Sequence, residues 1–204
     1  MHFCSLFFLC FTLKYSIFVD LIILYADTMR DVVRVFGLVL FPALLYAVAC
    51  GVINEELPTY EASSKVVEGD KAPDFTAMTL DDRSVTLSAM QGDEVLLVLF
   101  SHTCPDCKSL LDDMQAAKAE FDKLGVYVLL VARDGRDDVV AAYMDDNGYD
   151  FDVIADLERE IYNLYATMYV PRTYLIDADG DVVHTTIEYE ATHVSDILSE
   201  AEGL

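Results

Sequence analysis

The chain has 204 residues and a formal net charge of −23, all of which lies from Cys50 onward, because residues 1–49 carry three acids and three bases. A domain this acidic repels nucleic acid and anionic lipid headgroups, so neither is an expected partner, and the chain is long enough to bury a core. We interpret the acidic surface as keeping the domain soluble and monomeric, with the steering of basic partners as the alternative.

Residues 1–49 are predicted to be a hydrophobic leader. The run from Val35 to Ala49 is apolar, follows Arg30 and Arg34, and ends in small residues just before Cys50. A basic start, an apolar stretch and small residues before a cut are typical of secretory signals. The tetrapeptide Ala-Val-Ala-Cys that ends at Cys50 resembles the lipobox at which bacterial lipoproteins are cleaved and lipidated, although such boxes usually begin with Leu. Cys50 is therefore the candidate lipidation site.

The start of translation has two interpretations. Met29 stands just before the basic residues, where a lipoprotein signal is expected to begin, so we predict a start at Met29 and an untranslated 1–28. The alternative is a genuine N-terminal membrane segment, because about 20 apolar residues span a bilayer. Both interpretations place the acidic domain outside the cytoplasm, in a bacterial cell envelope, anchored to a membrane and facing the periplasm.

Behind the leader, residues 50–68 are polar and show no sustained periodicity, which predicts a flexible tether. Residues 69–204 are predicted to form one domain in which strands alternate with helices. The expected strands are 72–75, 84–87, 95–100, 126–132, 151–154, 173–176 and 182–186, and the expected helices are 103–124, 137–147, 157–165 and 191–201. The continuous apolar run 95–100 indicates a central buried strand. This order predicts an α/β sheet covered on both faces.

The domain contains two of the five cysteines, Cys104 and Cys107, in the sequence Cys-Pro-Asp-Cys. One pair at C-x-x-C spacing is typical of a redox motif, and it is also half of a metal site or a structural disulfide. At a helix start the spacing lets the two sulfurs bond, and the unpaired amides and the helix dipole stabilise a thiolate. Cys104 is the expected exposed nucleophile, and Cys107, one turn deeper, is expected to resolve the mixed disulfide. No cofactor is expected besides the Cys104–Cys107 disulfide.

Neighbouring residues are expected to define the helix start and tune the thiols. Thr103 and Asp106 match a capping box, and Pro105 gives up a first-turn amide that has no partner. Asp106 suits the helix dipole but places a negative charge beside the thiolate, and Lys108 partly offsets it. The motif therefore does not fix the redox potential.

From Gly69 onward the sequence resembles the TlpA/ResA-like branch of thioredoxin-fold proteins. The resemblance rests on the segment Gly69–Phe75, on the apolar strand that leads into Cys104–Lys108, and on the segment Val170–Asp177 followed by Gly180. It implies a thioredoxin-like α/β fold, with a central mixed sheet flanked by helices and an N-terminal β-hairpin extension. It also implies an enzyme, a thiol–disulfide oxidoreductase that acts more as a reductase than as an oxidant. Its partners would be protein thiol or disulfide substrates, such as apocytochrome c or misoxidised envelope proteins, and a membrane electron donor.

The resemblance further implies that Pro171 is a cis-proline facing the cysteines, with the Val170 backbone exposed to pair with a substrate strand. The sequence also departs from the family. Two carboxylates that handle the proton of the second cysteine in relatives are absent, because Val98 and Leu110 stand at their positions. His102 is the candidate substitute.

Two other functions remain open at this point. One is a copper- or zinc-binding lipoprotein that uses Cys104, Cys107 and His102, since C-x-x-C pairs also bind metals. The other is a thiol peroxidase, because Arg172 invites comparison with the arginine of peroxiredoxins. The rest of the peroxiredoxin signature, a Pro and a Thr upstream of the cysteine, is missing, which favours the oxidoreductase.

Overall fold

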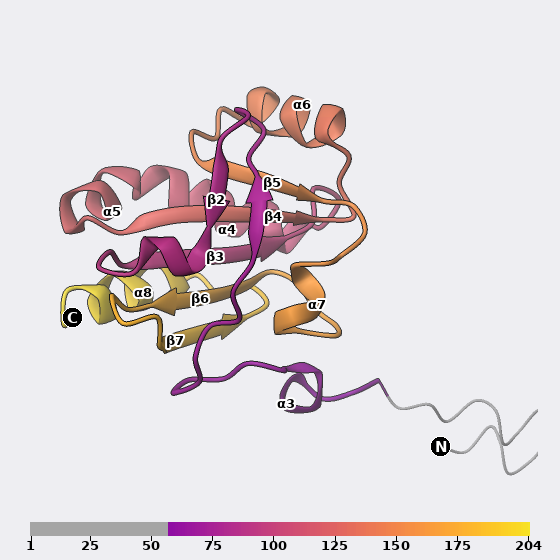
Figure 1. Ribbon diagram of the computed structural model, residues 1–204. Coiled ribbons are helices and arrows are strands. Elements are labelled where there is room, and N and C mark those ends of the chain that lie inside the picture. Colours follow the sequence, from indigo (N-terminus) through magenta and orange to yellow (C-terminus); the bar gives the residue numbers. More distant parts are fainter. Residues whose placement is uncertain (1–56) are drawn as a thin grey trace, which may run out of the picture. The chain divides into compact units, whose positions relative to one another are not determined.

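The computed structural model describes residues 57–204 of the chain. The predicted leader, the start at Met29 and the lipidation site at Cys50 lie outside these residues. In the described part, a five-stranded sheet in the order β5-β4-β3-β6-β7 occupies the centre (Figure 1). β3 pairs in parallel with β4, and β4 with β5, whereas β6 runs antiparallel to β3 and β7. The strands are β3 (Val95–Phe100), β4 (Tyr127–Arg133), β5 (Asp152–Asp156), β6 (Arg172–Ile176) and β7 (Val182–Ile187).

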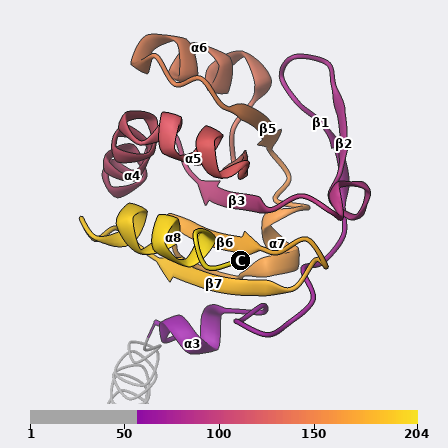
Figure 2. The same cartoon turned by 90° about the vertical axis from the view of Figure 1, so that its left-hand side faces the viewer.

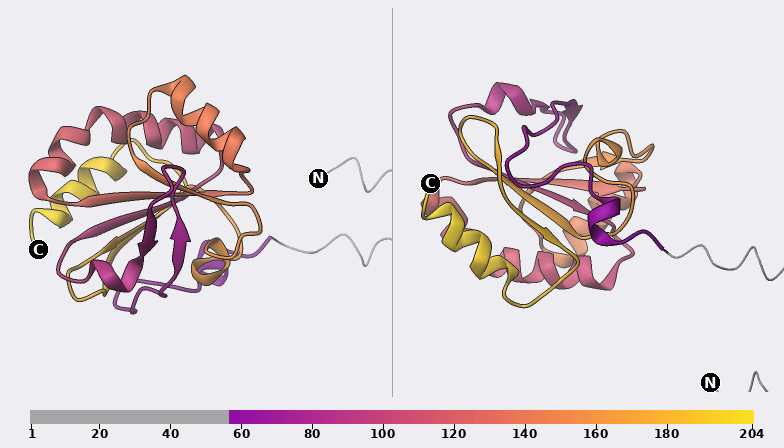
Figure 3. Two further views of the ribbon diagram at one scale, coloured as in Figure 1. Left: turned by 45° about the horizontal axis from the view of Figure 1, so that its top comes forward. Right: turned by 90° about the horizontal axis from the view of Figure 1, so that it is seen from below.

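Both faces of the sheet are covered, as the sequence predicts (Figures 2 and 3). Side chains alternate along β3, so Leu96 and Val98 enter one core while Leu97 and Leu99 enter the other. The first face carries α4 (Pro105–Ala116), α5 (Lys118–Leu124), α6 (Asp137–Asn147) and α8 (His193–Ala201). The second carries α7 (Tyr162–Tyr165), the 3-10 helix η1 (Leu87–Met90) and the hairpin of β1 (Thr76–Met78) and β2 (Ser84–Thr86). Within residues 57–204 no helix is both long and apolar enough to cross a membrane.

Two predicted helices differ from the structure. The expected helix 103–124 is divided into α4 and α5 at Ala117, where ψ is 8°. The expected helix 157–165 is reduced to α7, because the Asp156 carboxylate accepts hydrogen bonds from the amides of Ile161 and Tyr162 at 3.2 and 2.8 Å. Arg159 adopts a positive φ of 58° in the intervening turn. A side chain that binds backbone amides competes here with the helix that the sequence pattern favours.

The first expected strand, 72–75, is also displaced, since β1 begins at Thr76. The preceding residues are fixed by a side chain instead of a strand ladder. The Asp74 carboxylate accepts hydrogen bonds from the Ser88 amide at 2.8 Å and from its hydroxyl at 2.7 Å. These two bonds lower the pKa of Asp74. Pro73 lacks an amide for a ladder, so the pairing starts only after it.

Residues 58–67, which the sequence assigns to a flexible tether, pack against the domain instead. The short helix α3 (Tyr60–Ser63) is capped by Thr59, whose hydroxyl accepts a hydrogen bond from the amide of Ala62 at 3.2 Å. Ser64 then pairs with Ala166 as an antiparallel bridge. The compact unit accordingly begins at Pro58 and not at residue 69. The difference has a physical reason, because these contacts are made with residues about a hundred positions away and leave no local periodicity.

Candidate active site

The two cysteines lie at the N-terminus of α4, directly after the central strand β3. Pro105 occupies the first turn, as predicted, and Cys104 is the N-cap residue. Both cysteines are free thiols, with Cys104 partly exposed and Cys107 fully buried. The geometry lets an external disulfide reach Cys104 and leaves Cys107 accessible only from within the protein.

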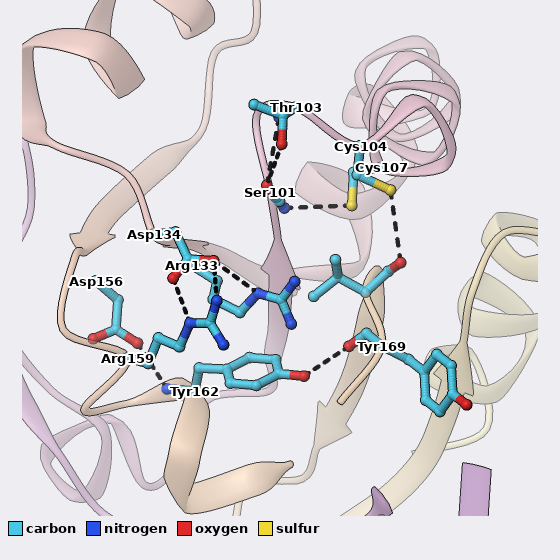
Figure 4. Close-up of polar contacts among 11 residues, drawn as sticks. Ser101, Thr103, Cys104, Cys107, Arg133, Asp134, Asp156, Arg159, Tyr162 and Tyr169 are labelled. Atoms are coloured by element: carbon cyan, nitrogen blue, oxygen red, sulfur yellow. Dashed lines mark hydrogen bonds and ion pairs between the residues drawn. The ribbon is translucent and has the colours of Figure 1, made fainter. Parts of the chain in front are cut away.

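Each sulfur has one backbone partner (Figure 4). The Ser101 amide donates to Cys107 Sγ at 3.4 Å, and Cys104 Sγ donates to the Val170 carbonyl at 3.7 Å. The Val170–Pro171 peptide bond is cis, as the family resemblance implies. Burial strongly raises the pKa of the Cys107 thiol, and the Ser101 hydrogen bond opposes part of that rise. Cys107 is therefore held as a thiol beside the sulfur that meets the substrate.

The predicted capping box is not formed. Because α4 starts at Pro105 and not at residue 103, Cys104 is the N-cap in place of Thr103, and it makes no capping hydrogen bond through its side chain. The Thr103 hydroxyl instead lies 3.1 Å from the Ser101 hydroxyl, within the loop that leads to the helix. Asp106 is exposed in the first turn, where its charge suits the helix dipole.

His102, the candidate proton acceptor, is half-buried and packs against Tyr143 with the ring centroids 6.3 Å apart. Its Nδ1 atom has no hydrogen-bond partner among residues 57–204. No hydrogen bond in this part of the chain joins His102 to either cysteine sulfur. Within the described residues His102 is therefore not hydrogen-bonded to the pair, and its role in proton transfer stays a prediction. Likewise, the described residues hold no cluster of three or more His, Cys, Asp or Glu side chains suited to a metal ion.

Arg172, which invited comparison with peroxiredoxins, does not face the cysteines. Its guanidinium is buried and donates to the Met168 carbonyl at 3.0 Å and to the hydroxyls of Ser64 and Ser63 at 2.8 and 2.6 Å. Arg172 therefore holds the α3 segment against β6. It is not placed to bind a peroxide at Cys104.

Arg133 and Tyr162, which the sequence patterns above do not single out, lie below the cysteine loop in Figure 4. Arg133 is the last residue of β4, and its guanidinium lies 4.7 Å from the centre of the Tyr162 ring. The Tyr162 hydroxyl donates to the Tyr169 carbonyl at 2.9 Å, one residue before Val170. A signal was available, because ligands in α/β sheets gather at the carboxyl ends of the strands and Arg133 directly follows an apolar run.

Comparison with known proteins agrees with this fold. The model of the AhpC/TSA family matches residues 68–185, which is more than half of the chain. Thiol-disulfide oxidoreductase ResA from Oceanobacillus iheyensis is 33% identical over 118 residues, covering 56% of this chain and 62% of the relative, so the match spans less than two thirds of that protein. ResA from Bacillus thuringiensis is 25% identical over 146 residues, covering 71% of this chain and 84% of the relative.

Among solved structures, a Bacteroides thetaiotaomicron protein assigned as a protein disulfide isomerase has a TM-score of 0.64 and 24% identity. The superposition covers 69% of this chain and 91% of that one, and it shows the fold. The family match includes the hairpin, both cysteines and the cis-proline. The chain therefore belongs to the AhpC/TSA family of thioredoxin-fold proteins.

Proposed function

We propose that this chain is a thiol–disulfide oxidoreductase that reduces protein disulfides outside the cytoplasm while tethered to a membrane. The observation that carries the proposal is the pairing of a partly exposed Cys104 with a fully buried Cys107 at a helix N-terminus, opposite the Val170 carbonyl. Relatives named thiol-disulfide oxidoreductase ResA support the same chemistry. The predicted leader and lipidation site at Cys50 support the tether and the envelope location.

The reaction has two steps in this proposal. The Cys104 thiolate attacks a substrate disulfide, which forms a mixed disulfide and releases one substrate sulfur. Cys107 then attacks the Cys104 sulfur, so the bond to the substrate breaks and the second substrate sulfur leaves with its electron pair. The two protons given up by the cysteines end on the two substrate thiols. The substrate gains two electrons, and the chain is left with a Cys104–Cys107 disulfide.

The Val170 backbone aligns the substrate in this scheme. An extended substrate segment pairs with the exposed backbone of the cis-proline loop, which brings its disulfide to Cys104. Pro105 and Asp106 in the first turn of α4 border the same sulfur. A second turnover requires that a membrane donor reduce the Cys104–Cys107 disulfide.

The second step is expected to accelerate steadily with pH. The thiolate is the attacking species, and burial raises the pKa of Cys107 above its ordinary value of 9.0. Between pH 7 and 9 the thiolate fraction should therefore grow about tenfold per pH unit without saturating. Stopped-flow measurement of mixed-disulfide resolution at several pH values checks this expectation. A plateau below pH 8.5 would contradict a thiol held neutral by burial.

The reduction potential tests the direction of the reaction. We expect a value near that of thioredoxin, about −270 mV, measured by thiol trapping of the full-length chain across dithiothreitol buffers. Cys4, Cys10 and Cys50 are replaced by Ser so that only the domain pair reacts, and the same chain with Cys104→Ser is the control. A value near −120 mV would assign the protein to the oxidants that make disulfides. Failure of the pair to form a reversible disulfide would reject the proposed function.

A further inference from the structure

Arg133 lies beside the residue that contacts the buried sulfur. Phe100 pairs with Ala132 in the parallel ladder of β3 and β4, so Ser101 and Arg133 follow side by side where that ladder ends, while Arg133 still pairs with Asp156 of β5. Neighbouring strands are about 4.8 Å apart, so the backbones of Arg133 and Ser101 are separated by roughly this distance. Ser101 is the residue whose amide donates to Cys107 Sγ.

The Arg133 guanidinium is also fixed from the other side of the site. It stacks over the Tyr162 ring, a geometry that favours a cation. Tyr162 in turn donates to the Tyr169 carbonyl, and the following residue, Val170, faces Cys104. The guanidinium therefore lies between the loop that contacts Cys107 and the loop that contacts Cys104 (Figure 4).

Within residues 57–204 the Arg133 guanidinium forms an ion pair with one carboxylate, that of Asp134, and it shares this carboxylate with Arg159. The Arg133 Nε atom lies 3.3 Å from an Asp134 oxygen, but this buried nitrogen makes no hydrogen bond to any residue between 57 and 204. Asp134 is engaged mainly by Arg159, which donates to it through two nitrogens and lowers the pKa of the carboxyl. The Arg133 side chain is only 18% exposed, so water screens its charge poorly.

We propose that Arg133 stabilises the Cys107 thiolate as it forms, and is a positioning residue for the second step of the exchange. The inference rests on the proposed function. Val98 and Leu110, both fully buried, stand where a carboxylate would take the Cys107 proton in relatives. A carboxylate acts by accepting the proton, whereas a fixed cation acts by lowering the free energy of the sulfur anion that remains. The proton itself ends on the departing substrate thiolate, so the step balances without another reactant.

The other groups around Cys107 do not supply this stabilisation. The Cys104 thiol at the N-cap of α4 and the Tyr143 phenol of α6 are acidic groups close enough to interact with Cys107, and a negative charge on either one disfavours a second one on Cys107. His102 packs against Tyr143, and the Asp134 carboxylate lies on the far side of Arg133. The attraction of Arg133 opposes the effect of burial on the Cys107 pKa, in the direction that the inference requires.

The test follows the two steps of the reaction separately with 4,4′-dithiodipyridine, an uncharged disulfide. The full-length chain, with Ser at positions 4, 10 and 50, is first reduced. It is then mixed with the reagent so that the protein is in excess over the reagent. Attack by Cys104 releases one thiopyridone, and resolution by Cys107 releases a second. The compared variants are Arg133→Gln, which removes the charge, and Arg133→Lys, which keeps it. Arg136→Gln, which removes an exposed arginine with 64% side-chain exposure, is the control matched in net charge.

Arg133→Gln is expected to slow the second release about threefold at pH 8 while the first release changes less. Loss of the charge raises the Cys107 pKa and so lowers the thiolate fraction, and the higher nucleophilicity of the more basic thiolate recovers only part of the lost rate. The pH profile of the second step should move by about half a pH unit to higher pH. Arg133→Lys should retain most of the rate, and Arg136→Gln should match the parent chain.

Three results would overturn the inference. The second release could be equally fast in Arg133→Gln and the parent chain, or both releases could slow by the same factor, which indicates a general distortion. The third is an equal loss in Arg133→Lys and Arg133→Gln, since the charge then has no role. Release of only one thiopyridone by the parent chain is a different outcome. It would reject the proposed function, and the inference about Arg133 with it.

Discussion

The Cys107→Ser variant is expected to accumulate as a covalent mixed disulfide with its substrate, whereas Cys104→Ser is expected to lose disulfide reduction completely. The difference follows from burial. Cys104 is partly exposed at the N-cap of α4, so it can still attack an external disulfide when Cys107 is absent. Cys107 has no exposed surface, so it cannot replace Cys104 in the first step.

Reduction of insulin by dithiothreitol, with the full-length chain as catalyst, measures the turnover of both variants. Non-reducing electrophoresis and intact mass identify the trapped adduct. The control carries Ser at positions 4, 10 and 50 and keeps both domain cysteines, so its activity should match that of the unchanged chain. Turnover by Cys104→Ser, or an adduct on Cys107 in that variant, would contradict the assigned order of the two thiols.

The sequence was sufficient to predict features that depend on local patterns. The run 95–100 is apolar throughout, and all six of its side chains are buried in β3. The expected helix 137–147 has the same bounds as α6, and Gly148, which follows it in the sequence, ends it in the left-handed conformation that glycine adopts readily. The cysteine pair at a helix start belongs to the same class, because spacing and helix geometry suffice to place both sulfurs.

Features set by distant contacts could not be predicted in this way. Arg133 is functionally placed only because β4 ends beside Ser101, which depends on strand pairing rather than on neighbouring residues. Thr103 matches a capping box in sequence, yet its hydroxyl contacts Ser101 and the helix starts at Pro105. The segment 58–67 has no periodicity because its partners lie far along the chain. In each case the deciding interaction is absent from the local sequence pattern.

Replacing Ser63 and Ser64 together by Ala is expected to lower the free energy of unfolding by about 3–5 kcal/mol. Their hydroxyls accept two of the hydrogen bonds donated by Arg172, whose side chain is 1% exposed. A hydrogen bond to a charged group contributes about 1.5–3 kcal/mol, and the variant leaves the buried guanidinium with the Met168 carbonyl but without both hydroxyl acceptors. Urea denaturation of the full-length chain measures the loss. Ser109→Ala combined with Ser195→Ala is the control, because those hydroxyls bond only to nearby backbone carbonyls and should change stability by about 0.5 kcal/mol at most.

A third substitution separates two effects on stability, the poorly compensated charge of Arg172 and the lost contacts of the serine side chains. Adding Arg172→Met to the two serine substitutions removes the buried guanidinium, so part of the lost stability should return, with a coupling of about 1 kcal/mol or more. No recovery would mean that the arginine is not what the serines stabilise. The segment 58–67 also supports the site. The Pro58 carbonyl accepts a hydrogen bond at 2.7 Å from the hydroxyl of Tyr169, the residue just before Val170. Compared with the parent chain, the serine variant should therefore lose more of its rate at Cys104 with a protein disulfide than with 4,4′-dithiodipyridine. Only the protein substrate needs an ordered Val170 backbone to pair with.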